Sequence, residues 1–106
     1  MTIVFRDNVQ TCETQKIEEL FRSAGFADPS AYRHNSVSIR LRVRDPRFQG
    51  MTRVARMKLL EPIIEQLPDE TQQDLIFVLP IAPGEEHSID YLLMNLEFDQ
   101  PRPSSL

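Results

Sequence analysis

The chain has 106 residues, of which 41% are hydrophobic, enough for one hydrophobic core and too few for two. With one cysteine and two histidines, it can form neither an internal disulfide nor a zinc site built from paired ligands. No window approaches the roughly 18 apolar residues that span a bilayer, and no basic start precedes an apolar run. We therefore expect one cytoplasmic domain without a membrane partner.

The net charge of −4 hides a separation of charge along the chain. Residues 33–58 carry eight basic side chains and one acidic side chain, a net charge of +7. Residues 59–100 carry ten acidic side chains and no Lys or Arg. If the two stretches lie on different faces of the domain, the molecule is an electric dipole.

The first predicted helix covers residues 12–24, with Thr11 as its N-cap and Gly25 at its end. Its apolar side chains recur at helical spacing: Ile17, Leu20, Phe21 and Ala24. A short strand over residues 30–34 and a turn at Asn35 and Ser36 follow.

The clearest strand signal lies over residues 37–44. Apolar and polar side chains alternate there, with Val37, Ile39, Leu41 and Val43 between Ser38, Arg40, Arg42 and Arg44. Because strand side chains have a period of two, the apolar ones share the core face and the three arginines line the other face about 7 Å apart. Asp45 and Pro46 end this strand.

A second helix is predicted over residues 52–67, with an apolar stripe of Val54, Met57, Leu60, Ile64 and Leu67. Pro62 removes a backbone donor there and predicts a kink near residues 58–61 or a division into two shorter helices. Residues 66–71 are a loop or a new helical start. The apolar run 75–79 (LIFVL) fits a strand covered on both faces. A final short helix is indicated by Ile89, Leu92, Leu93 and Leu96.

The order helix, strand, strand, helix, strand, helix has no internal repeat and no linker, which predicts one α/β (α+β) layer structure. We expect this domain over residues 11–98. An N-terminal extension precedes it over residues 1–10, where residues 2–6 (TIVFR) have the composition of a short strand. A flexible tail follows over residues 99–106.

Residues 48–64, FQGMTRVARMKLLEPII, resemble the signature of the BolA family, an F-x-G followed after five positions by R-H-R-x-V and aliphatic helix positions. The residues on this pattern are Phe48, Gly50, Arg56, Lys58, Leu59, Leu60 and Ile64. The alternating strand before the motif and the strand and P-x-E-E-like turn after it also resemble the family order. The resemblance covers roughly residues 12–96 and implies a BolA-like α-β-β-α-β-α fold, with a three-stranded mixed sheet and helices packed on one face.

The resemblance also implies a partner and a cofactor. BolA-like proteins typically pair with monothiol glutaredoxins and share a 2Fe-2S cluster, using a histidine at the start of the last strand and a second ligand from the loop before the long strand. This chain has Leu75, or neighbouring Asp74, at the first position, and Met57 where the helix motif has its histidine. Only His34 lies near the loop, as a weak metal-ligand candidate. Because leucine cannot bind iron, we expect no cofactor.

The candidate binding residues are basic: Arg40, Arg42, Arg44, Arg47, Arg53, Arg56 and Lys58. They could contact the phosphates of a nucleic acid. Alternatively, they form a solvated strand face, or one that the chain's own acidic segment, residues 85–99, neutralises. The acidic overall balance and the expected lack of aromatic side chains on the arginine face count against nucleic acid.

No catalytic constellation can be read, because His87, Ser88 and Asp90 are too close in sequence to supply a triad from separate elements. We therefore predict a non-enzymatic binding or regulatory module that acts through protein–protein interaction, with a monothiol glutaredoxin as the partner that the resemblance implies. Two alternatives stay open. One is nucleic-acid binding through Arg40, Arg42 and Arg44, and the other is a homodimer in which the basic face of one subunit meets the acidic segment of the other.

Overall fold

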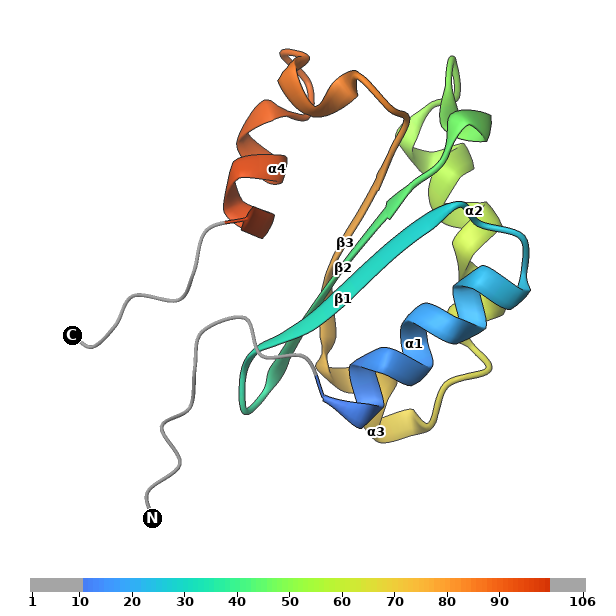
Figure 1. Ribbon diagram of the computed structural model, residues 1–106, viewed down its shortest axis with the longest axis vertical. Helices are drawn as coiled ribbons and strands as arrows, with labels where there is room; N and C mark the ends of the chain where they lie inside the picture. Colours follow the sequence, from blue (N-terminus) through green and yellow to red (C-terminus); the bar gives the residue numbers. More distant parts are fainter. Residues whose placement is uncertain (1–10, 100–106) are drawn as a thin grey trace, which may run out of the picture.

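The computed structural model describes residues 11–99, which form four α-helices, two 3-10 helices and a three-stranded sheet (Figure 1). In chain order these are α1 (Cys12–Ser23), β1 (Asp28–Asn35), β2 (Ser38–Arg44), η1 (Pro46–Phe48), α2 (Arg53–Ile64), α3 (Asp69–Asp74), β3 (Leu75–Ile81), η2 (Glu85–His87) and α4 (Leu92–Asp99). The expected α+β fold class with a mixed sheet is confirmed. The expected extension over residues 1–10, with its strand over 2–6, lies outside the described residues, as does the tail beyond Asp99.

The sheet has the strand order β1-β2-β3, so β2 is central. β1 and β2 are antiparallel, and the register places Tyr32 opposite Arg40. β2 and β3 are parallel, with Arg40 beside Phe77. A parallel pair needs a crossover connection, which α2 and α3 supply here.

The cap of α1 follows the sequence prediction. The Thr11 side chain accepts from the Thr14 backbone N–H at 3.2 Å, and the Thr11 N–H donates to the Thr14 hydroxyl at 2.7 Å, which completes a capping box. Gly25, just after the helix, has φ +98°, a conformation that glycine adopts without a Cβ clash. Both predicted ends of the helix are confirmed.

The main core lies between the sheet and the helices α1 and α2 (Figure 1). Its fully buried side chains include Ile17 and Phe21 of α1, Ile39, Leu41 and Val43 of β2, Phe48 and Leu60. The core face predicted for β2 is therefore confirmed except at Val37, which is 65% exposed. Val37 lies in the turn before β2 begins, so strand alternation does not apply to it.

α2 runs without a break from Arg53 to Ile64, so a division into two helices within residues 52–67 is wrong. Pro62 lies in the last turn, where its missing donor removes a single hydrogen bond before the helix ends. The predicted apolar stripe is also partly wrong. Val54 is 67% exposed, while Arg56 is buried together with Leu60 and Ile63.

The final helix corrects the expectation that the helices pack on one face. α4 lies on the opposite face of the sheet from α1 and α2 (Figure 1), where Phe98 forms a second core with Tyr32, Leu79 and Ile81. β3 presents the last two of these side chains away from the main core, so they need a separate cover. Consequently β3 is covered on both faces only near its C-terminal end, whereas Ile76 is 68% exposed.

No helix within residues 11–99 combines the length and apolar character needed to cross a membrane.

Candidate functional site

The three arginines of β2 lie on the sheet face that residues 85–99 cover, and their side chains are largely shielded from solvent. The exposed fractions of the side chains of Arg40, Arg42 and Arg44 are 11%, 13% and 28%. Each guanidinium forms an ion pair with a carboxylate from residues 85–99. The chain's own acidic segment therefore neutralises the arginine face, which does not lie open to solvent.

Arg40 is held from several directions. It donates to the backbone carbonyl of Glu97, and its Nη2 lies 3.5 Å from the Glu97 carboxylate. The same Nη2 lies 3.4 Å from Nε2 of His34. The guanidinium carbon lies 5.3 Å from the centre of the Phe77 ring, within the range of a cation–π contact.

Arg42 contacts both polar and aromatic groups of α4. Its Nη1 donates to Oδ1 of Asn95 at 2.7 Å and to Oδ1 of Asp99 at 3.1 Å. Its guanidinium carbon lies 4.4 Å from the centre of the Phe98 ring. One helix thus supplies an amide, a carboxylate and a ring to one arginine.

Arg44 joins the sheet to the segment before α4. Its Nε lies 2.6 Å from the Glu86 carboxylate, and its Nη1 lies 3.2 Å from that of Asp28, its cross-strand partner. The backbone N–H groups of Glu86 itself and of Gly84, together with the Arg44 charge, lower the pKa of the Glu86 carboxyl. Glu86 is therefore held in its charged form.

The arginine face also carries aromatic side chains, so the expectation that it lacks them is wrong. Tyr32 of β1 and Phe77 of β3 flank Arg40 in register across the sheet, and both pack against Phe98. The Tyr32 hydroxyl donates to the Phe98 backbone carbonyl, and burial raises the pKa of this hydroxyl. Sequence alternation within β2 could not reveal rings that the neighbouring strands supply.

Arg56 is buried and joins two parts of the fold. The sequence had predicted it to lie in a binding surface. Its side chain is 3% exposed and forms two hydrogen bonds to the Glu85 carboxylate, at 2.6 and 2.9 Å. It also donates to the backbone carbonyls of Met51 and Pro80 at 3.0 and 3.1 Å. The paired charges raise the pKa of Arg56 and lower that of Glu85. The pair ties α2 to η2 and so fixes where the acidic segment leaves the sheet.

Arg47 packs on the loop after α1. Its Nη2 donates to the Gly25 carbonyl at 2.5 Å, and its guanidinium carbon lies 4.1 Å from the centre of the Phe26 ring. Asp45 accepts from the Arg47 backbone N–H and from the Ala27 N–H, both at 2.8 Å. Burial opposes the charge of Asp45, but these hydrogen bonds outweigh burial and lower its pKa.

Arg53 and Lys58 remain exposed on α2. Arg53 borders an open cleft of about 660 Å³, lined by residues 49–53, the Arg56–Glu85 pair, Asp90 and Tyr91. The seven predicted binding residues therefore do not form one surface. Arg40 and Arg42 contact α4, Arg44 pairs with Glu86 before that helix, and Arg56 is buried. The other three, Arg47, Arg53 and Lys58, are exposed.

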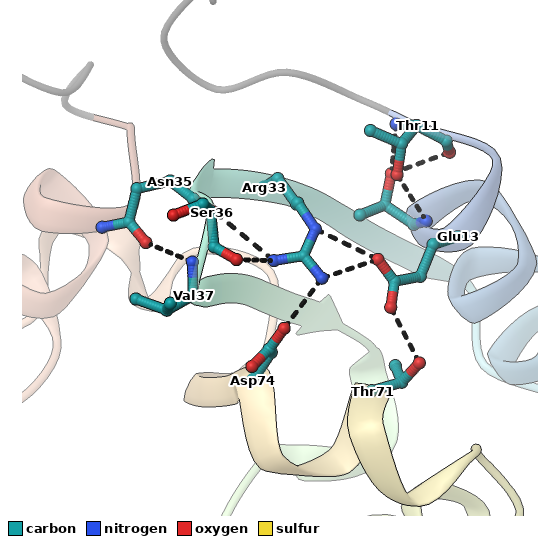
Figure 2. Close-up of polar contacts among 9 residues, drawn as sticks. Thr11, Glu13, Arg33, Asn35, Ser36, Val37, Thr71 and Asp74 are labelled. Carbon is teal, nitrogen blue, oxygen red and sulfur yellow. Dashed lines mark hydrogen bonds and ion pairs between the residues drawn. The ribbon is translucent and has the colours of Figure 1, made fainter.

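Sequence reasoning missed the Arg33 network, which Figure 2 shows at the other end of the sheet. Arg33 donates to Oε1 of Glu13 at 3.1 and 2.8 Å and to Asp74 at 2.9 Å, and further to carbonyls of the β1–β2 turn. Thr71 donates to the other Glu13 oxygen at 2.8 Å. Burial opposes the charge of Arg33, but Asp74 and Glu13 outweigh it and raise its pKa. The network joins α1, β1 and α3. Its members are far apart in the sequence, so no spacing of residues predicts it.

Comparison of the chain with protein-family models, curated proteins and solved structures gives no match.

The positions that the BolA resemblance singled out for metal binding are occupied in other ways. Leu75 begins β3, Asp74 pairs with Arg33, and Met57 packs against the main core. His34 has the Arg40 guanidinium at its Nε2, and that positive charge opposes a cation. Within residues 11–99, no three His, Cys, Asp or Glu side chains gather in a way that could hold a metal ion.

Proposed function

We propose that the chain is a non-enzymatic, BolA-like binding module that acts through protein–protein contacts made by the outer side of α4. The proposal rests on three apolar side chains that point away from the sheet. Ile89, Leu93 and Leu96 are 95%, 77% and 53% exposed. We call these three residues the α4 outer patch. Leu93 and Leu96 lie on α4, and Ile89 lies in the turn just before it. Single exposed apolar residues are ordinary, but a group within one short segment is typical of an interaction site.

The inner side of α4 makes this argument stronger. Phe98 is 4% exposed against the sheet, and Tyr91 and Met94 pack around the same core. α4 therefore carries apolar side chains on both sides, beside its polar residues Asn95, Glu97 and Asp99. The sheet covers the apolar side chains of one side only. A protein partner on the outer side would complete the cover.

The strand pairing is compatible with the BolA-like part of the proposal. The antiparallel β1–β2 pair and the parallel β3 agree with the fold that the resemblance implies, whereas α3 is an additional helix and α4 lies on the opposite face. A monothiol glutaredoxin is therefore the first partner to test. Because Leu75 stands in place of the ligand histidine, we expect the chain to bind without contributing a cluster ligand.

The test is a calorimetric titration of the full chain with a monothiol glutaredoxin, with visible absorbance recorded on the complex. We expect the wild type to bind without cluster colour that depends on this chain. A Leu93→Ser/Leu96→Ser variant should weaken binding at least about tenfold, because it removes apolar area from the contact. Val54→Ser is the matched control, since Val54 is 67% exposed on α2.

Two results would overturn the proposal. One is the absence of any complex with the wild type. The other is a complex that Leu93→Ser/Leu96→Ser leaves unchanged while Val54→Ser weakens it, which would move the contact from α4 to α2. Both sites are exposed, so circular dichroism should show the same fold for all the variants.

A further inference from the structure

The sheet face under α4 carries side chains that a packed interior does not require. A row across the three strands consists of Tyr32, Arg40 and Phe77, and β2 continues with Arg42 and Arg44 on the same face. Replacing buried ion pairs with apolar side chains of similar volume is often neutral or stabilising. Stability alone therefore does not explain three arginines on one strand, with Arg40 between two aromatic rings.

The segment that covers this face offers two kinds of group. Glu86, Glu97 and Asp99 place a carboxylate near each arginine. Phe98 places a ring against Tyr32, with centres 4.9 Å apart, and under the Arg42 guanidinium at 4.4 Å. An anion at each arginine and a flat ring among aromatic side chains are also what a polynucleotide offers, as phosphates and bases.

We propose that the sheet face formed by Tyr32, Arg40, Arg42, Arg44 and Phe77 is a binding surface for single-stranded nucleic acid, and that residues 85–99 occupy it as an internal mimic of that ligand. A single strand fits better than a duplex because its unpaired bases are free to stack on rings. The inference goes beyond the proposed protein contact, which uses the outer side of α4.

Binding at this surface requires α4 to move away. The apparent affinity of a site that is open for only part of the time is reduced by the open fraction, so α4 acts as an internal competitor. Glu97 and Asp99 are the carboxylates that hold α4 itself to β2, and their side chains are 58% and 56% exposed. Removing these two charges should raise the open fraction. In the open form Phe98 leaves the second core, while the main core against α1 and α2 stays intact.

The experiment measures fluorescence anisotropy of labelled oligouridine and oligothymidine of about 12 nucleotides, a length within the usual site sizes, at low salt with the full chain. The Glu97→Gln/Asp99→Asn variant is the opened variant. We expect it to bind at least about tenfold more tightly than the wild type. Affinity should fall steeply as salt is raised, because released counterions contribute to phosphate binding. Comparison of the two oligonucleotides shows whether the 2′-hydroxyl is read.

Matched variants separate this surface from a general effect of charge. Glu61→Gln/Glu65→Gln removes two exposed carboxylates, one on α2 and one at its C-cap, and changes the net charge by the same amount. It should leave binding within about twofold of the wild type. Arg42→Ala in the opened background should abolish the gain. Because Arg42→Ala could disturb the fold, Arg44→Gln serves as a second variant, since its side chain is 28% exposed and lies at the edge of the face.

A peptide of residues 85–99, added in trans, should compete with the oligonucleotide for the opened variant. The proposal is overturned by no gain in the opened variant, or by an equal gain in Glu61→Gln/Glu65→Gln. It is also overturned if a polyglutamate peptide binds the opened variant as tightly as the oligonucleotides, because the face would then fit an acidic protein segment. The oligonucleotide-binding variants change neither Leu93 nor Leu96, so the proposed protein contact stands or fails separately.

Discussion

The two faces of the sheet are covered by different kinds of side chain. Against α1 and α2 lie aliphatic and aromatic groups such as Leu41 and Phe48, both 0% exposed. Against α4 lie the arginines of β2, paired with carboxylates and stacked near rings. Burial of apolar area depends little on pH or salt, whereas ion pairs lose much of their attraction to desolvation and screening. We therefore expect the first face to supply most of the stability and the second to respond to conditions.

The largest expected effect comes from the first face. Leu41→Ala should lower the free energy of unfolding by about 3–5 kcal/mol, because it removes buried methyl groups and leaves a cavity between the sheet and the helices. Urea unfolding followed by circular dichroism measures the loss. Val37→Ala is the control, since Val37 shares the same alternating pattern but is 65% exposed. A comparable loss for both variants would contradict the assignment of the core face.

The next effect concerns the Arg56–Glu85 ion pair, which joins α2 to the segment that leads to α4. Arg56→Ala should lower the free energy of unfolding by about 2–3 kcal/mol. It leaves the Glu85 carboxylate without its charged donor and removes the donor from two backbone carbonyls. Arg53→Ala, an exposed arginine in the first turn of the same helix, should cost no more than about 0.5 kcal/mol. Equal costs would show that Arg56 acts through helix propensity alone.

Acid should lower the free energy of unfolding, because Glu85 and Glu86 lose their charge as the pH falls. The pKa values of Glu85 and Glu86 are lowered in the folded chain by donors from Arg56 and from backbone N–H groups. Their contribution to stability is therefore complete above the unfolded pKa of 4.5 and is lost as the pH falls through the folded values. Urea unfolding at a series of pH values checks this loss.

In a Glu85→Gln/Glu86→Gln variant, the free energy of unfolding should fall less steeply with decreasing pH than in the wild type. The pH profile of Leu41→Ala should instead run parallel to that of the wild type, because leucine binds no proton. If the free energy of unfolding of the glutamine variant falls as steeply with pH as that of the wild type, other carboxyl groups cause the acid sensitivity.

The smallest expected effect is at the exposed end of the arginine face. Asp28→Asn removes the cross-strand partner of Arg44 and should cost about 0.2–1 kcal/mol at low salt. At about 1 M salt the cost should vanish, since charges are then screened within about 3 Å. The cost of Leu41→Ala should persist at high salt, and a cost that persists for both would remove the contrast between the two faces.

Local patterns in the sequence were sufficient for α1 and for the core face of β2. The Thr11 cap, the end at Gly25 and the alternation over residues 37–44 depend on near neighbours in the chain, and the structure confirms all three except at Val37. The acidic cover of the arginines was also among the alternatives, because the charges separate along the chain.

What the sequence could not predict depends on distant partners. The Arg56 side chain is polar by composition, and its burial requires Glu85, which lies 29 residues later. α4 has apolar groups on both sides, so its periodicity does not say which side meets the sheet. The rings beside Arg40 come from the neighbouring strands and become visible only with the register.

The order of charges along the chain has a consequence for the time at which they meet. Synthesis proceeds from the N-terminus, so the β1–β2 hairpin with Arg40, Arg42 and Arg44 is complete well before Glu86, Glu97 and Asp99 have been made. During that interval Arg40 and Arg42 have none of the acidic partners that residues 85–99 supply, and Arg44 has only Asp28. The acidic segment is the last described part of the chain to be made, so neutralisation of the sheet comes late in folding, after the strands that it covers.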